Sequence, residues 1–385
     1  MFVPFLVFRN AFRHKLRTTL TMVGIVVAIV AFGLLRTIVD AWYAGAEATS
    51  SARLISRNAI SLVFPLPLNY AQKIRQVPGV TGVAAANWFG GEYINSSNFF
   101  PQFAIDPGPY LDMYPEYKLS EAERKAFLLD RQGAVVGRKL AERYGWKIGD
   151  TIPLRGTIYP GTWTFTLRGI YDGADAKVDE SQFFFHWALL NERIKRIYPR
   201  RADSVGIYVV EIREPGQAAE ISQRIDATFK NSLGETLTET EKAFQLGFVA
   251  MTEAILVAVQ AVSFVIIVII MAVMANTMAM TARERYSEYA TMKAIGFSNG
   301  FVAMLIFAES IAIALIGGVL GVALTYPIAS AFGNSLSSLF PIFNVSQETV
   351  LMQMGCALVV GVVAALIPAW RAAKVRIVDG LRAVA

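Results

Sequence analysis

A charged island lies between two long apolar runs, and it has the sequence Arg283-Glu284-Arg285-Tyr286-Ser287-Glu288-Tyr289-Ala290-Thr291-Met292-Lys293-Ala294-Ile295-Gly296. No residue from 254 to 282 carries a charge, and the run from 301 to 331 carries only Glu309. Each apolar run exceeds the ~20 residues that cross a bilayer as a helix. We therefore predict that the charged island is a water-facing connection between two membrane spans.

The pattern of the charged island predicts a helix. Glu284 and Glu288 lie four residues apart and share a helical face. No proline or glycine interrupts the segment before Gly296, which suits a helix C-terminal cap, and Ser298 can cap the start of the next helix. A rigid helix in a short loop can carry force, and we expect this one to receive a push from another protein.

The composition is that of a membrane protein with a sizeable soluble part, since 54% of the residues are hydrophobic and 17% are charged. The basic residues cluster beside the apolar runs, and no recognition motif or basic and aromatic patch indicates nucleic-acid binding. The single cysteine, Cys356, excludes an intrachain disulfide and a cysteine zinc site. His14 and His186 are far apart in sequence without ligand spacing, so we predict no metal site.

Residues 1–17 combine apolar and basic side chains at helical spacing, which predicts an amphipathic helix at an anionic membrane surface. The apolar positions are Phe2, Phe5, Leu6, Phe8 and Phe12, and the basic positions are Arg9, Arg13, Lys15 and Arg17. A basic start before an apolar run is also typical of a signal peptide, with Ala44-Gly45-Ala46 as a cleavage site. The run from residue 18 exceeds the ~7–15-residue core of a signal peptide, which favours a retained span.

From residue 40 to residue 247 the composition changes, and turn signals, alternating strands and amphipathic helices predict an α+β domain. Trp163, Phe165 and Leu167 alternate with threonines, as in a strand with one buried face. Further strands are predicted within 80–86, 134–136, 146–154 and 204–211, and helices at 138–144 and 217–229.

No catalytic pattern appears in this domain. Asp172 and Asp175 suit a turn better than an acid–base or metal pair, and His186 suits a partly buried structural position. Near the end of the domain, Thr238 and Glu241 have the spacing of a capping box. The helix that they would open is predicted to continue without a break to residue 282. At ~1.5 Å per residue it exceeds the membrane thickness and should protrude as a stalk.

The third apolar run contains the acidic residue Glu309 and two glycines, Gly317 and Gly321, at GxxxG spacing. Small residues at this spacing allow close approach of helices, so we predict a dimer contact or a helix–helix contact there. A carboxylate at mid-membrane costs on the order of 2–3 kcal/mol, so Glu309 should face protein or water, unless it lies near the membrane boundary.

The basic residues mark the N-terminus, the charged island and the C-terminus, and the positive-inside rule places all three in the cytoplasm. The predicted architecture is four transmembrane helices with a large α+β extracytoplasmic (periplasmic) domain between the first two. The predicted segments are 1–17 (amphipathic helix), 18–39 (first span), 40–247 (periplasmic domain with the start of the stalk helix), 248–282 (second span), 283–298 (cytoplasmic coupling helix), 299–330 (third span), 331–348 (short periplasmic loop), 349–370 (fourth span) and 371–385 (cytoplasmic tail).

This layout resembles the permeases of the MacB/FtsX/LolC-type (type VII) ABC transporter superfamily. The residues that carry the resemblance are Phe8-Arg9-Asn10 and Lys15-Leu16-Arg17-Thr18 before the first span, Val135-Val136-Gly137-Arg138-Lys139-Leu140 and Ile148-Gly149-Asp150 in the large domain, Asn276, Glu284-Arg285, Glu288 and Lys293-Ala294-Ile295-Gly296 around the island, Glu309 and Gly317-Gly318-Val319-Leu320-Gly321 in the third span, and Ile367-Pro368-Ala369-Trp370-Arg371-Ala372-Ala373 with Val378-Asp379-Gly380-Leu381-Arg382 at the end. Phe297 departs from the small residues common at its position.

The resemblance implies a non-catalytic permease in the bacterial inner membrane. MacB carries its ATPase domain in the same polypeptide, whereas this sequence holds no G-x-x-x-x-G-K-[ST] phosphate loop, and nothing before the first span is long enough to hold one. We therefore expect a separate ABC ATPase dimer, which binds ATP and Mg²⁺, and no cofactor on this chain. The resemblance also implies a second permease copy or a homologous permease, membrane lipid, and an adaptor (membrane fusion protein) with an outer-membrane channel.

The resemblance implies that ATP-driven motion enters through the coupling helix and reaches the periplasmic domain through the stalk. The residues predicted to contact the ATPase are Arg283, Glu284, Arg285, Glu288, Tyr289, Met292, Lys293 and Gly296, and those predicted to pack within the membrane are Glu309, Gly317 and Gly321. Three function classes remain: a transporter that exports or extracts a periplasmic or outer-leaflet substrate (drug, lipid or lipoprotein), an FtsX-like mechanotransmitter that activates a periplasmic partner, and a membrane-anchored enzyme or sensor. The size of the domain favours the first, and the third lacks any catalytic constellation.

Overall fold

The computed structural model describes residues 9, 13–47, 49–96, 98–175, 177–335, 340, 342–375 and 377, and these belong to two compact units. The helical unit is drawn from residues 1–41, 252–335 and 343–385. The α/β unit is drawn from residues 42–251 and 336–342. The predicted amphipathic helix (residues 1–17), the loop around Pro341 and the run 378–382 lie wholly or mostly outside the described residues.

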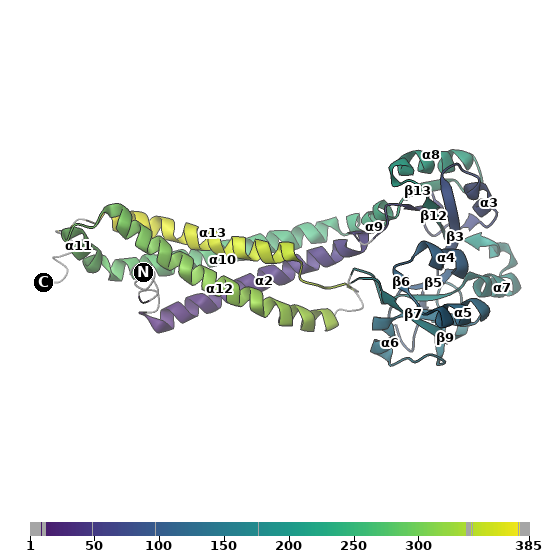
Figure 1. Cartoon of the computed structure of the whole chain (residues 1–385), viewed down its shortest axis with the longest axis horizontal. Coiled ribbons are helices and arrows are strands. Elements are labelled where there is room, and N and C mark those ends of the chain that lie inside the picture. The colour runs from purple at the N-terminus through teal and green to yellow at the C-terminus, as the bar shows by residue number, and fades with distance from the viewer. Residues whose placement is uncertain are drawn as a thin grey trace. The chain divides into compact units, whose positions relative to one another are not determined.

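Four long helices form the helical unit (Figure 1): α2 (Lys15–Glu47), α10 (Glu253–Glu284), α12 (Asn299–Ser335) and α13 (Gln347–Ala373). All four are long and apolar enough to cross a membrane, which confirms the predicted four spans. α10 has 32 residues. At ~1.5 Å per residue it measures about 48 Å, which is longer than the ~30 Å hydrocarbon core of a bilayer.

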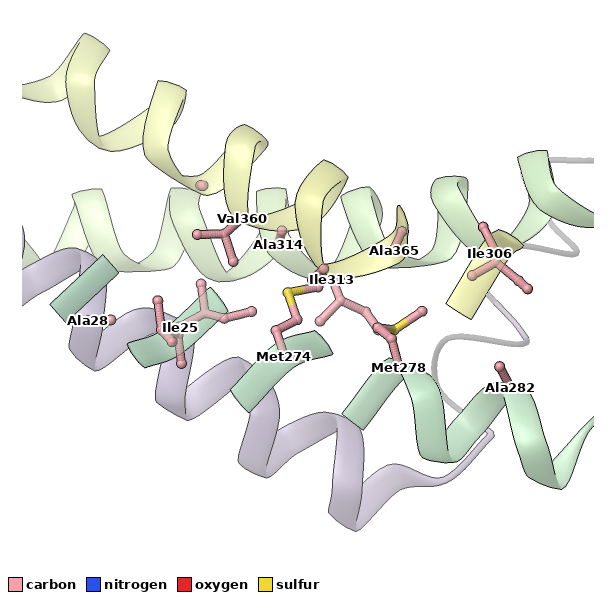
Figure 2. Close-up of a cluster of buried hydrophobic side chains, with 14 of the residues drawn as sticks. Ile25, Ala28, Met274, Met278, Ala282, Ile306, Ile313, Ala314, Val360 and Ala365 are labelled. Carbon is pink, nitrogen blue, oxygen red and sulfur yellow. The ribbon is translucent and has the colours of Figure 1, made fainter. Parts of the chain in front are cut away.

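The helices pack around a shared apolar core, in which side chains from all four helices point toward one another (Figure 2). Met274 of α10 and Ala314 of α12 are fully buried in it. Gly317 and Gly321 of α12 lie against α2. A Cβ atom at Gly317 would lie 2.8 Å from Ile25 Cγ2, and one at Gly321 would lie 2.8 Å from Ile29 Cβ. The predicted small-residue face is therefore occupied within the chain by the first span.

A buried polar contact joins three of the spans. Gln353 of α13 is fully buried, and its Nε2 atom donates to the carbonyl of Ile29 at 2.8 Å and to Thr325 Oγ1 at 2.9 Å. A Cβ atom at Gly33 would lie 2.1 Å from the same Nε2 atom. The absent side chain of Gly33 makes room for the amide.

A single large sheet organises the α/β unit. Its strands are β1 (Arg53–Asn58), β3 (Val80–Trp88), β4 (Gly91–Glu92), β5 (Gln102–Ile105), β6 (Tyr117–Lys118), β7 (Gly133–Gly137), β8 (Thr151–Gly156), β9 (Gly161–Gly173), β10 (Phe183–His186), β12 (Ile207–Ile212) and β13 (Thr236–Thr240), while β2 (Leu66–Pro67) and β11 (Ser204–Val205) form a separate pair. The helices are α3 (Tyr70–Arg75), α4 (Pro107–Met113), α5 (Glu121–Leu129), α6 (Arg138–Tyr144), α7 (Trp187–Ile197), α8 (Ala218–Thr228) and α9 (Glu241–Ala250), with short 3-10 turns at Pro199–Arg201 and Pro215–Gln217.

The strand order is β13-β1-β12-β3-β5-β10-β7-β9-β8-β4, with β6 paired to β9. The pairs β10–β5 and β7–β9 are parallel, and the other pairs are antiparallel. One face carries a single core under α4 and α5. The other face carries two cores, one with α3 and α8 and one with α6 and α7, and Trp187 packs against both. Trp163, Phe165 and Leu167 of β9 are buried together, as their alternation predicts.

The predicted unbroken helix from Thr238 to residue 282 is wrong. Thr238 lies in β13, paired with Ser56 of β1, and its hydroxyl donates to Ser56 Oγ at 2.9 Å. Thr240 is the actual N-cap, because its side chain accepts from the amide of Ala243. The helix that begins there, α9, ends at Ala250, and two residues separate it from the start of α10. Strand pairing with β1, which is distant in sequence, overrides the local capping signal.

The polar contact of Gln353 generates a test of how the spans are held. We expect Gly33→Ala to displace the amide and cost roughly 1–3 kcal/mol, the usual range for an unsatisfied buried polar group. The measurement is the thermal midpoint of unfolding of the purified chain in detergent. Gly355→Ala is the matched control, because a Cβ atom there meets nothing within 4 Å. Equal midpoints for the two variants would contradict the proposed role of Gly33.

Candidate functional site

The charged island folds as the short helix α11 (Tyr286–Ala294) between α10 and α12. It is shorter than the predicted 283–298 helix because Arg285 leaves helical geometry, with φ −104° and ψ 14°. At its end the amide of Phe297 donates to the carbonyl of Met292 and the amide of Gly296 to that of Lys293, both at 3.1 Å. With φ +106° at Gly296, these bonds form a Schellman cap, which confirms the predicted C-terminal cap.

The next helix begins as predicted. Ser298 Oγ accepts from the amide of Phe301 at 3.2 Å, directly ahead of α12. A C-cap and an N-cap therefore follow one another within the loop, and their hydrogen bonds constrain the short connection between α11 and α12.

A buried ion pair connects the loop to the third span. Arg285 and Glu309 are 3% and 2% exposed, and Arg285 Nη1 donates to both carboxylate oxygens of Glu309 at 2.8 Å. Arg285 Nε also donates to Glu288 Oε2 at 2.9 Å. Burial lowers the pKa of Arg285, but the charge of Glu309, the nearby Tyr289 and the hydrogen bonds to Glu309 and Glu288 together outweigh burial and leave the pKa raised. The guanidinium is therefore charged, and Glu309 faces protein rather than lipid.

The first turn of α2 and the residues just before it supply further ion pairs. Arg17 donates from both terminal nitrogens to the two carboxylate oxygens of Glu284, each at 2.7 Å, and Arg13 pairs with Glu288. Burial raises the pKa of Glu288, but its hydrogen bonds with Arg285 and Arg13 outweigh this and leave the pKa lowered. Both acidic residues of the loop are thus bound to residues more than 260 positions away.

Lys293 connects the loop to the fourth span. Its Nζ atom donates to the carbonyl of Ala373 at 2.6 Å and to that of Val375 at 2.9 Å. These carbonyls belong to the last turn of α13 and to the residues after it, where helical partners are lacking. Burial lowers the pKa of Lys293. A cation in this position stabilises the negative end of the helix.

The structure divides the predicted contact residues into those that are buried or paired within the chain and those that are exposed. Arg285 and Tyr289 are buried, and Glu284, Glu288 and Lys293 have partners within the chain. Met292 packs partly against the apolar core of the spans, and Arg283 is exposed. The exposed residues at the end of α11, which we call the exposed loop face, are Thr291, Ala294, Ile295, Gly296 and Phe297.

The exposed loop face is largely apolar. Ile295 is 75% exposed and Phe297 is 45% exposed, and the ring of Phe297 stacks on that of Phe301 at 4.7 Å. Sequence reasoning missed Ile295 and Phe297 as contact candidates because it favoured the charges. The signal that could have found them is two large apolar residues beside a helix-ending glycine in a water-facing loop.

The α/β unit holds a groove that the sequence did not indicate. It has a volume of about 770 Å³ and lies between α3 and α7, lined by Val83 and Ala85 of β3 and by Trp187. Arg75 and Asp106 also line it. Burial raises the pKa of Asp106, against the nearby charge of Arg75. Val83 and Ala85 also belong to the core with α3 and α8, so the groove borders that core.

The remaining candidates in the α/β unit have partners within the chain. His186 is buried, and its Nε2 atom lies 2.7 Å from the carbonyl oxygen of Phe127. Asp172 accepts from Arg138 at 2.8 and 2.9 Å, which lowers the pKa of Asp172. Asp175 accepts from the amide of Lys177 in a turn. Among the described residues, no group of three histidine, cysteine or acidic side chains is placed to hold a metal ion.

Four spans, a mixed α/β unit between the first two and a tightly held loop between the next two define a multi-pass membrane protein of the permease kind. Two family models match the chain: the MacB-like periplasmic core domain over residues 18–228, and the FtsX-like permease C-terminal domain over residues 261–377. The chain therefore belongs to the MacB/FtsX family of ABC transporter permeases.

Individual relatives agree with this family. The chain is 23% identical to the macrolide export ATP-binding/permease protein MacB of Photorhabdus laumondii, over 98% of this chain and 60% of that protein. It is 21% identical to an uncharacterised ABC transporter permease of Methanocaldococcus jannaschii, over 97% of this chain and 96% of that protein. It is 26% identical to an uncharacterised ABC transporter permease protein of Mycobacterium tuberculosis, over 52% of this chain and only 22% of that protein.

Among solved structures, the extracellular domain of the ABC-type transporter YknZ from Gram-positive bacteria matches 49% of this chain and 98% of its own, with 12% identity and a TM-score of 0.35.

The buried pair of Arg285 and Glu309 generates a stability test. We expect Glu309→Gln to cost about 3–5 kcal/mol, because it leaves Arg285 buried without its counter-charge. Replacing both partners, as Arg285→Met with Glu309→Leu, should cost much less, since no charge is then left unpaired. The measurement is chemical or thermal unfolding of the purified chain in detergent, with the exposed Arg283→Ala as control. Equal losses in the single and double variants would show that the pairing is not what holds the loop.

Proposed function

We propose that this chain is the membrane subunit of an ABC transporter in the bacterial inner membrane, with both termini and α11 in the cytoplasm. The charge distribution supports this orientation. Arg13, Lys15 and Arg17 stand at the start of α2, and Arg371 and Lys374 stand at the end of α13, so the same side of the membrane carries the basic residues.

We propose that ATP hydrolysis takes place in a separate ATPase dimer, which binds ATP and Mg²⁺, while this chain binds no cofactor and catalyses no reaction. The names of two relatives support this division. The Photorhabdus protein, of which the chain spans 60%, is named an ATP-binding/permease protein. The Methanocaldococcus protein, of which the chain spans 96%, is named a permease. No phosphate-loop motif occurs in the sequence.

The single observation that carries the coupling proposal is that the loop of residues 284–293, which contains α11, is joined to α2, α12 and α13. Arg285 binds α12, Glu284 and Glu288 bind the start of α2, and Lys293 binds the end of α13. A displacement of α11 therefore has to move these helices with it. The ATPase docks on the exposed loop face, and the charged residues carry its motion into the spans.

For the substrate, we propose export or extraction of an apolar or amphipathic molecule from the periplasm or the outer leaflet. The groove of the α/β unit supports transport over the FtsX-like alternative, since about 770 Å³ is the size of a small-molecule pocket. A second copy of the chain, or a homologous permease, completes the transporter. Affinity capture from native membranes separates the two functions: an adaptor with an outer-membrane channel supports efflux, and a cell-wall hydrolase supports activation of a periplasmic enzyme.

The docking proposal predicts the effect of charge on the exposed loop face. We expect Ile295→Asp to leave membrane insertion intact and to reduce the co-purified ATPase at least tenfold, because an unpaired carboxylate is desolvated in the contact. The measurement is the amount of a phosphate-loop ATPase retained on the affinity-purified permease, together with ATP hydrolysis by the eluate. Ile94→Asp in the α/β unit is the control, since Ile94 is exposed to a similar degree, 79% against 75%. Retention of the ATPase by Ile295→Asp would refute docking at this face.

The coupling proposal predicts a different defect for residues that hold the loop. We expect Glu288→Lys, which sets a third cation beside Arg13 and Arg285, and Gly296→Pro, which disrupts the Schellman cap, to leave insertion intact. Both should uncouple ATP hydrolysis from transport. The measurement compares hydrolysis and substrate movement in proteoliposomes of the reconstituted complex. Wild-type values for both activities would show that these residues do not couple.

A further inference from the structure

A groove lies between the first turns of α2 and the last third of α10, with a volume of about 630 Å³. Lys15 and Arg17 line its outer end, Thr21 and Thr277 line it further in, and Leu20 and Val273 are its apolar residues. The groove is therefore cationic toward water and apolar toward the centre of the bilayer. A phospholipid has the same order, with a charged headgroup followed by apolar acyl chains.

The charges around the groove leave a cationic surplus. Arg17 is shared with Glu284, Arg13 is shared with Glu288, and His14 Nε2 lies 3.7 Å from Glu284. The remaining charged pair nearby, Arg285 with Glu309, is balanced within itself. Lys15 is exposed and has no acidic partner among the residues that the structure describes. An anionic group in the groove would contact Lys15, whose charge no described acidic side chain neutralises, and Arg17 at the edge of the groove.

The depth of the groove matches the interfacial layer of a membrane. Thr21 lies about 9 Å along the helix axis from Lys15, and Thr277 lies about 10 Å from Glu284, at ~1.5 Å per residue. The headgroup layer on each side of the hydrocarbon core is several ångströms thick. With Lys15 among the phosphates, the threonines then lie near the ester region, where the acyl chains begin.

The threonines constrain the headgroup further. Thr21 donates to the carbonyl of Arg17 at 2.9 Å, and Thr277 donates to the carbonyl of Val273 at 3.0 Å. Each hydroxyl proton is thus used within its own helix, and each oxygen keeps a lone pair that can accept. A headgroup that carries its own hydroxyl donors fits these acceptors better than a quaternary amine.

An apolar stripe continues from the groove along α2. Leu16, Leu20, Val23 and Val27 are all exposed, and their spacing puts them on one helical face. We propose that the groove binds an anionic phospholipid of the inner leaflet, with its phosphate at Lys15 and Arg17 and an acyl chain along this stripe. The assignment of the leaflet rests on the proposed orientation, whereas the binding itself needs no ATPase.

The experiment is native mass spectrometry of the full chain, delipidated in detergent and then titrated with phosphatidylglycerol or phosphatidylcholine of identical acyl chains. We expect at least one phosphatidylglycerol per chain to be retained more strongly than phosphatidylcholine. Lys15→Gln should weaken the retention roughly fivefold, the usual effect of one basic residue at an anionic surface. Thr277→Phe, which fills the groove, should abolish the preference. Lys374→Gln at the end of α13 is the control for general attraction and should bind as the wild type.

Four outcomes would overturn the proposal. The first is equal retention of the two lipids, and the second is wild-type retention of phosphatidylglycerol by both Lys15→Gln and Thr277→Phe. The third is a change in the ratio of monomer to dimer in these variants with unchanged lipid retention, which would assign the groove to a second copy of the chain. Competition by glycerol 3-phosphate as effective as that by the lipid would likewise point to a free phosphate. The lipid assay contains no ATPase, so its result does not bear on the coupling proposal. The lipid-binding proposal and the coupling proposal can therefore fail separately.

Discussion

The ion pair between Arg285 and Glu309 is the constraint on which the α11 end of the bundle depends. Both groups are almost completely withdrawn from solvent, and each buried charge would cost several kcal/mol without the other. Neither the loop that carries Arg285 nor α12, which carries Glu309, can shift by more than a fraction of a side-chain length without separating the two charges. The loop between the second and third spans is therefore held against the third span by electrostatics as well as by the chain.

The other contacts of the loop extend this constraint to the whole bundle. The acidic residues on either side of Arg285 bind Arg17 in the first turn of α2 and Arg13 just before it, and Lys293 binds the carbonyls at the end of α13. At the far side of the same bundle, Gln353 joins α13 to α2 and α12 through a buried amide. Polar contacts thus stand near both ends of an apolar core, and they fix the register of helices whose apolar surfaces alone would allow sliding.

Local signals predicted a large part of this fold. Apolar length gave the four spans, and Gly296 and Ser298 marked the end of α11 and the start of α12, because capping depends on residues close in sequence. Pairings over long distances were not predictable: Arg17 and Glu284 are 267 positions apart. Thr238 shows the same limit, since its pairing with β1 converts an expected helix start into a strand. The charges of the island predict a contact site, but their pattern does not say which of them face inward.

The division of the loop into paired charges and exposed apolar residues bears on how a partner protein could bind it. If the charges made the contact with an ATPase, each would exchange its partner within the chain for one outside, and the helix would loosen as it docked. With the charges already satisfied, docking can use the exposed apolar residues Ile295 and Phe297, whose burial costs no existing ion pair. Under the proposed coupling, attachment and transmission rest on different side chains, so the loop would bind an ATPase without weakening its contacts with the spans.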